Sequence, residues 1–169
     1  MKTISMLALC ILIPVSSCFG EQAWAPVIKD GTTTVSGGTA GFKITVNIFS
    51  RVVSLPANEK EEDKSHSTNC TYTVKPCTEI YKLEVSVNGT QIMVPRSVFS
   101  DLGDITNARV VSDVHGAMVL QLTGGDGDEG YYVYVHLSRG KIIERDVYSF
   151  AGPKAGPLET TKYYSVEFP

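Results

Sequence analysis

The chain is poor in the residues that most often signal catalysis or nucleic-acid binding. Its 169 residues include three histidines, four cysteines and one tryptophan, and 15 Lys and Arg stand against 18 Asp and Glu, for a formal net charge of −3. Nucleic-acid binding asks for a basic stripe, which this mildly acidic sequence lacks. The same charge balance disfavours binding of the protein surface to anionic membranes.

A long hydrophobic run is also missing, since a transmembrane helix takes about 20 apolar residues. The most apolar stretch follows a single cation, Lys2, and extends from Ile4 to Val15, with small residues after it. This pattern is typical of a secretory signal peptide over residues 1–20. We therefore expect a mature protein that folds outside the cytoplasm, in the periplasm or as a secreted protein.

Two processing sites fit this leader. Cleavage after Gly20 uses Cys18 and Gly20 as the small residues that a signal peptidase tolerates, and leaves Glu21 at the N-terminus. Alternatively, residues 15–18 match the loose pattern of a bacterial lipobox, in which Cys18 is acylated and the protein becomes an outer-membrane lipoprotein. The first site is slightly favoured, because Val15 stands where a lipobox prefers Leu. A lipid on Cys18 is the only membrane contact that we expect.

Cysteine counting predicts one disulfide. Cys10 leaves with the leader and Cys18 either leaves or is lipidated, so Cys70 and Cys77 remain as a pair. Exported chains form disulfides, and the sequence has neither the Cys-x-x-Cys redox spacing nor a His/Cys set with zinc spacing. We expect a structural disulfide and no metal or cofactor.

The mature chain is expected to have two parts. Residues 21–40, interrupted by Pro26 and Gly37-Gly38, are predicted to form an N-terminal connector, and residues 41–169 a single β domain. The only tryptophan, Trp24, is expected to pack onto the domain, and a stacking platform for sugars is the less favoured alternative.

Period-two alternation of apolar and polar residues from Phe42 to Ile48 predicts a half-buried strand. The phase of this alternation shifts near Phe49-Ser50, which predicts a bulge or a change of sheet there. Residues 58–69 carry charges of both signs and no apolar side chain, so we expect a solvent loop.

Asn88-Gly89 is the strongest turn signal, because a type I′ hairpin turn needs positive φ at both positions. Closing this turn places Val87 opposite Thr90, Val85 opposite Ile92 and Leu83 opposite Val94. Residues 95–103 follow as the one expected helical turn outside the leader, with Pro near the start and Gly at the end.

Two further hairpins are predicted, with turns at His115-Gly116 and at Arg139-Gly140. Residues 160–168 are expected to form a last strand. About eight short strands joined by tight turns, with one short helical turn, predict an all-β fold, either an antiparallel sandwich or a barrel.

The glycine-rich segment over residues 124–130 holds three carboxylates, those of Asp126, Asp128 and Glu129. Hard oxygen ligands of this kind suit Ca²⁺, but the segment lacks the EF-hand pattern and offers few ligands. We interpret it as a solvent-exposed hairpin loop rather than a metal site.

No catalytic residue is assigned. Ser112, Asp113 and His115 lie close in sequence, but a nucleophile elbow is missing and His115-Gly116 is a natural turn. His136 falls in the middle of an expected strand, among tyrosines, where a half-exposed sheet residue is the simpler interpretation.

The second face of the strand over residues 131–138 is the favoured binding surface. It carries Tyr132, Tyr134 and His136, and a two-residue turn at Arg139-Gly140 would bring Arg145 opposite Tyr134 as a cation–π pair. Tyr and Arg are enriched at interaction hot spots, so Tyr132, Tyr134 and Arg145 are the predicted binding residues. The alternative is that this face forms sheet core or an ordinary Tyr-rich surface.

Three stretches of the C-terminal half carry a resemblance: Val87-Asn88-Gly89 through Leu102, Thr123-Gly124-Gly125-Asp126, and Arg145-Asp146-Val147-Tyr148-Ser149. They look like stretches of uncharacterised secreted or periplasmic β-rich proteins of Gram-negative bacteria. This resemblance implies export and brings no established activity.

By elimination, we expect an exported envelope protein that acts by binding and is not an enzyme. A small disulfide-linked exported domain is a common format for inhibitors and immunity-type proteins, directed against a lysozyme or a rival's toxin. The expected partner is therefore a protein in the cell envelope. The alternative is a structural or accessory subunit of an envelope or surface assembly, and a hydrolase ranks third.

Overall fold

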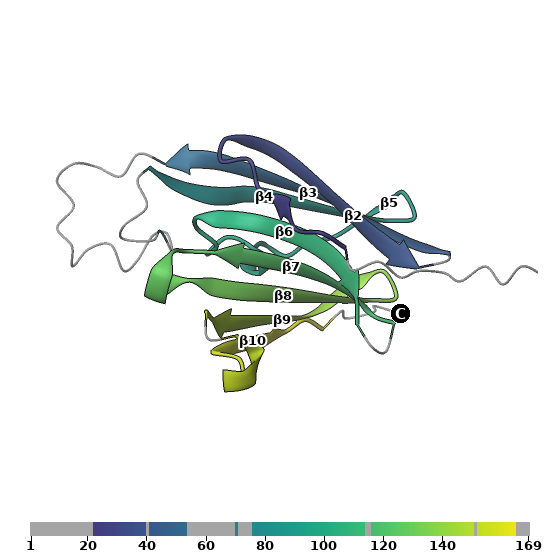
Figure 1. The fold of residues 1–169 in the computed structure, drawn as a ribbon. Helices are drawn as coiled ribbons and strands as arrows, with labels where there is room; N and C mark the ends of the chain where they lie inside the picture. Colours follow the sequence, from purple (N-terminus) through teal and green to yellow (C-terminus); the bar gives the residue numbers. More distant parts are fainter. Residues whose placement is uncertain are drawn as a thin grey trace, which may run out of the picture.

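The computed structural model describes residues 22–39, 41–53, 70, 76–113, 116–150 and 152–164. Strands dominate these residues and form two antiparallel sheets that pack face to face as a β-sandwich (Figure 1). The fold class expected from the sequence is confirmed, in its sandwich form. No helix of the described segments is long and apolar enough to cross a membrane.

The described residues form ten strands. They are β1 (Ala25–Pro26), β2 (Gly31–Thr39), β3 (Phe42–Val53), β4 (Cys77–Val87), β5 (Thr90–Ile92), β6 (Ile105–Ser112), β7 (Met118–Gly124), β8 (Tyr131–Ser138), β9 (Lys141–Ser149) and β10 (Glu159–Lys162). The larger sheet has the order β1-β6-β7-β8-β9-β10, and the smaller sheet has the order β2-β3-β4-β5. Three short 3-10 turns are also present: η2 (Arg96–Val98), η3 (Gly127–Glu129) and η4 (Pro153–Ala155).

The core lies between the two sheets and is built by period-two alternation. Ile44, Val46 and Ile48 of β3 are fully buried on the inner face of the smaller sheet. Leu122 and Val133 of the larger sheet are equally buried from the opposite side. The predicted irregularity in β3 is confirmed, since the register against β4 shifts between Phe49 and Ser50.

The expected connector is itself part of the sandwich, which corrects the boundary at residue 40. β2 pairs with β3 along its whole length, and β1 pairs with β6 through Ala25 and Ala108. Thr33 and Val35 alternate with exposed neighbours and are buried, because Thr and Val suit a half-buried strand. The Gly37-Gly38 pair lies inside β2 and does not interrupt the strand.

The Asn88-Gly89 hairpin forms with the predicted register, Val87 opposite Thr90 and Val85 opposite Ile92. Asn88 and Gly89 have φ of 50° and 82°, as a type I′ turn requires. β5 ends at Ile92, so the predicted Leu83 pair with Val94 is not part of the ladder. The helical turn η2 lies within the expected residues 95–103.

The β8–β9 hairpin turns at Arg139-Gly140 as predicted, with Ser138 opposite Lys141. The register then shifts between His136 and Leu137, so that His136 faces Glu144 and Val135 faces Arg145. The extra residue is Ile143, which is half exposed on the bulge. A one-residue slip moves every later side chain to the opposite face, and Arg145 therefore points into the sandwich.

Cys70 and Cys77 form the predicted disulfide, with 5.5 Å between their Cα atoms. The leader with Cys18 and Gly20, the polar loop over residues 58–69 and the turn residue His115 lie outside the described residues.

Candidate functional site

Aromatic side chains gather on the outer face of the larger sheet, which faces away from the core. Tyr132 and Tyr134 of β8 are half-buried there, because they alternate with the buried Val133. Tyr132 stacks on Phe150 with ring centroids 6.1 Å apart and planes 18° apart. Tyr134 packs on Tyr148 at 5.2 Å. Two of the three predicted binding residues thus share one aromatic surface.

Trp24 joins this face from the N-terminal segment, just before β1. The guanidinium carbon of Arg109 lies 4.3 Å from the centroid of the Trp24 ring, a cation–π contact. Arg109 is held in turn by Gln121, whose Oε1 accepts a hydrogen bond from Nε at 2.7 Å. Trp24 packs onto the domain as expected, on its outer face and not in its core.

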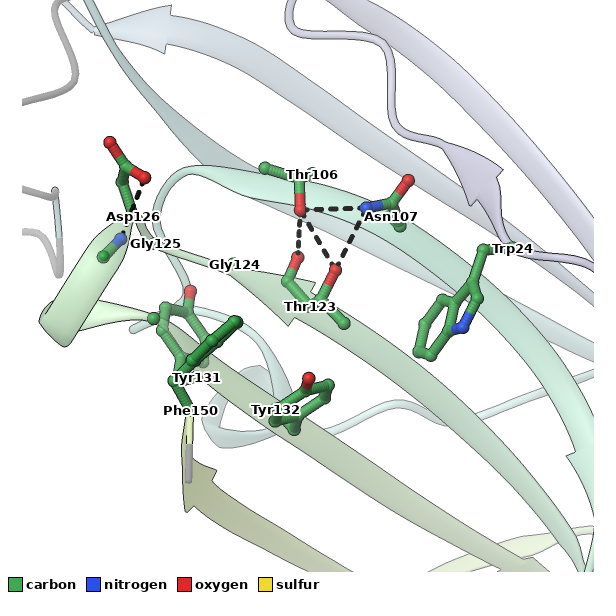
Figure 2. Close-up of a pocket in the computed structure, with 12 residues that line it drawn as sticks. Trp24, Thr106, Asn107, Thr123, Gly124, Gly125, Asp126, Tyr131, Tyr132 and Phe150 are labelled. Atoms are coloured by element: carbon green, nitrogen blue, oxygen red, sulfur yellow. Dashed lines mark hydrogen bonds between the residues drawn. The ribbon is translucent and has the colours of Figure 1, made fainter. Parts of the chain in front are cut away.

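A pocket of about 530 Å³ opens on the outer face between Trp24 and the Tyr132–Phe150 pair. We call it the aromatic pocket. Figure 2 shows Thr106, Asn107 and Thr123 side by side between Trp24 and the other aromatic rings. These three residues come from β6 and β7, whose ladder places Asn107 directly opposite Thr123.

The polar residues of the aromatic pocket hold one another in place. The Asn107 amide nitrogen donates to the hydroxyls of Thr106 at 3.2 Å and Thr123 at 3.3 Å. The two hydroxyl oxygens are 3.0 Å apart. Because the amide nitrogen is engaged, the carboxamide oxygen of Asn107 and the threonine hydroxyls are oriented before any ligand arrives.

The segment over residues 124–130 walls the other end of the pocket (Figure 2). Asp126, Asp128 and Glu129 are exposed, which confirms the predicted exposed loop between β7 and β8. Asp126 orders it, because its carboxylate accepts a hydrogen bond of 2.8 Å from the Gly127 amide at the start of η3. A Cβ on Gly130 would lie 2.9 Å from the Phe150 ring, so glycine there lets Phe150 close this wall.

Tyr131 lines the pocket on its core side, where it packs against the hydrophobic core. Its hydroxyl donates to the Gly103 carbonyl at 2.5 Å, and burial raises the pKa of the phenol well above its usual value. Nearby carboxylates of Asp101 and Asp104 raise this pKa further. Tyr131 is therefore a neutral structural side chain at physiological pH.

Arg145 is not on the binding surface, which corrects the third predicted binding residue. Its side chain is 3% exposed, and it donates to Asp101 at 2.6 Å and to Glu159 at 3.1 Å. The predicted stack with Tyr134 does not form, because the bulge at Ile143 puts Asp146 opposite Tyr134. Arg145 instead joins β9 to β10 and to the segment that follows η2.

His136 lies beside two carboxylates on the same outer face. Its Nε2 is 3.2 Å from Asp146 Oδ2, and the Thr160 hydroxyl donates to the other Asp146 oxygen at 2.6 Å. Glu144 completes a group whose donor atoms all lie within 4.8 Å of one another. A second such group, among the described residues, contains the disulfide cysteines and Asp104, and neither group includes the loop carboxylates.

The alternation of residues in β8 predicts the position of the tyrosines, but the sequence does not predict the polar half of the pocket. Thr106, Asn107 and Thr123 have no motif, and only the pairing of β6 with β7 brings them together. Asp113, which lies close in sequence to Ser112 and His115, accepts a hydrogen bond from the Ala117 amide at 2.8 Å and so stabilises a turn.

The fold and the site define a disulfide-linked β-sandwich with an aromatic pocket on one outer face. Comparisons with protein-family models, with curated proteins and with solved structures found no match for this chain.

Proposed function

We propose that this is an exported binding protein and that the outer face of the larger sheet is its binding surface. Export is supported by the leader-like first 20 residues and by the Cys70–Cys77 disulfide, which is compatible with an oxidising compartment. The periplasm and the extracellular medium both fit this proposal.

The observation that carries the proposal is the aromatic pocket. Large amphipathic side chains line it beside oriented polar groups, and ligand sites typically combine aromatic walls with a few placed hydrogen-bonding groups. Tyr and Trp give much contact area at a low cost in conformational entropy. A surface with no binding role would gain little from keeping Trp24, Tyr132 and Phe150 together at the solvent boundary.

The proposed target is an envelope-directed factor, such as a lysozyme or a rival's toxin, which the protein inhibits or masks. This choice rests on the format of the molecule, a small disulfide-linked exported domain. The alternative target is a fixed partner in an envelope or surface assembly.

The test is calorimetric titration of a lysozyme into the mature protein and its variants. We expect Tyr132→Ala and Tyr134→Ala each to weaken binding at least tenfold, because each removes a hot-spot side chain. Tyr81→Ala is the matched control, since Tyr81 is 47% exposed on the smaller sheet. Equal affinity of all three variants would contradict the assigned surface.

A further inference from the structure

We propose that the aromatic pocket is a carbohydrate-binding site that takes a neutral sugar ring. This inference rests on the proposed function, because it assigns a ligand class to the same face of the larger sheet. Three properties of the pocket support this proposal: its charge, its aromatic walls, and its polar floor, which is formed by Thr106, Asn107 and Thr123.

The charge of the pocket argues against an anionic ligand. Among the described residues that line it, Asp126 is the only charged side chain, and no lysine or arginine is present. Phosphate and carboxylate ligands are normally held by Arg, Lys or a set of backbone amides at a helix N-terminus. Arg109 lies outside this lining, with its guanidinium against Trp24 and its Nε on Gln121.

The aromatic walls suit a ring that presents C–H groups. A sugar ring has a face of weakly positive C–H bonds, and the face of an aromatic ring is negative. Trp24 stands on one side of the pocket, and the stacked Tyr132 and Phe150 stand on the other (Figure 2). The Arg109 contact fixes the orientation of the indole, so little rotamer entropy is lost when a ligand packs against it.

The floor suits a ligand with many hydroxyl groups. A hydroxyl both donates and accepts, and so do Thr106, Thr123 and the carboxamide of Asn107. These groups already bond one another, and a purely apolar ligand would bury them with their remaining hydrogen-bonding capacity unused, which is costly. A sugar satisfies them and at the same time covers the aromatic rings.

The size of the pocket agrees with this assignment. Its volume of about 530 Å³ lies within the range of roughly 300–1,000 Å³ that small-molecule sites occupy. The glycines of the segment over residues 124–130 leave that wall free of long side chains, and a Cβ on Gly127 would meet nothing within 4 Å.

The single tryptophan gives a direct assay, because all intrinsic tryptophan fluorescence of the mature protein comes from Trp24 in the pocket. The probes are triacetylchitotriose, which represents cell-wall sugar strands, and maltotriose, which represents other neutral glycans. We expect one of them to change the emission in a saturable way, with a dissociation constant of about 1 mM or tighter. Inorganic phosphate should produce no saturable change.

Substitutions in the pocket test whether the saccharide binds there. Tyr132→Ala and Asn107→Ala should each weaken saccharide binding at least tenfold, one by removing an aromatic wall and the other by removing a polar group. Tyr81→Ala on the smaller sheet should bind as the native protein does, and circular dichroism checks that every variant is folded. The inference is overturned if neither saccharide changes the Trp24 emission, or if both pocket variants keep native affinity.

This inference and the proposed function fail separately. If Tyr132→Ala loses lysozyme binding while neither saccharide binds, the surface is correct and the sugar assignment is wrong. If a saccharide binds and the protein shows no affinity for lysozyme, the pocket ligand is right and the expected protein target is wrong. If the protein binds neither lysozyme nor a saccharide, both proposals are contradicted.

Discussion

Arg145 shows how a charged residue can be mistaken for a binding residue. Its guanidinium is almost fully buried, while its partners Asp101 and Glu159 are 41% and 53% exposed. An arginine in this position links separate segments through charge-assisted hydrogen bonds. Its role is to hold β9, β10 and the segment after η2 together.

Arg145→Ala is therefore expected to lower stability and leave binding unchanged. Loss of the buried guanidinium removes two charge-assisted hydrogen bonds and leaves a cavity, at a cost of roughly 1–3 kcal/mol. Denaturant unfolding measures the change. Arg51→Ala is the control, since its exposed pair with Glu79 should contribute about 1 kcal/mol or less. Native stability with weakened binding would restore Arg145 to the binding surface.

The sequence could predict the tyrosines of the site because alternation alone separates Tyr132 and Tyr134 from the buried Val133. It could not predict the position of Arg145. That position depends on the bulge at Ile143, which nothing in the local residue types distinguishes from a regular strand.

At the scale of elements, turn residues were the most informative part of the sequence. Asn88-Gly89 and Arg139-Gly140 both adopt positive φ and close hairpins at the predicted positions. The sequence does not predict β2, because Thr-rich and Gly-rich segments are typical of loops as well as strands, and only its pairing with β3 decides between them. The pairing of distant strands is also what assembles the pocket floor.

The disulfide constrains the start of β4. Cys77 is 1% exposed at the first position of this strand, and its bond to Cys70 closes a short loop. On the entropy model, such a loop stabilises the folded state by about 2–3 kcal/mol.

Cys70→Ala should therefore lower the melting temperature by about 5–10 °C in calorimetry, since a domain of this size shifts a few degrees per kcal/mol. Adding reductant to the variant should cause no further decrease. A variant that melts like the oxidised native protein would contradict a stabilising role for the disulfide.

At the scale of the whole molecule, the sandwich gives each sheet one outer face, and the two faces differ. On the smaller sheet, Lys82 lies over Phe49 at 4.9 Å and Arg51 over Tyr81 at 5.5 Å, so cations cover its aromatic rings. On the larger sheet, Arg109 likewise lies over Trp24 at 4.3 Å, and the Tyr132–Phe150 stack borders the aromatic pocket. The aromatic pocket, and not the cation–π contacts, distinguishes the two faces, and binding is therefore placed on the larger sheet.

The central claim is tested most directly by a matched pair of obstructing substitutions. Thr123→Arg fills the floor of the aromatic pocket, and Thr34→Arg adds the same side chain at an exposed position of β2 in the smaller sheet. Affinity is then measured for both variants, for lysozyme and for whichever of triacetylchitotriose and maltotriose changes the Trp24 emission of the native protein. We expect Thr123→Arg to lose at least a hundredfold in affinity while Thr34→Arg binds normally, with both variants folded. Normal binding by Thr123→Arg, or loss of binding by Thr34→Arg alone, would contradict it.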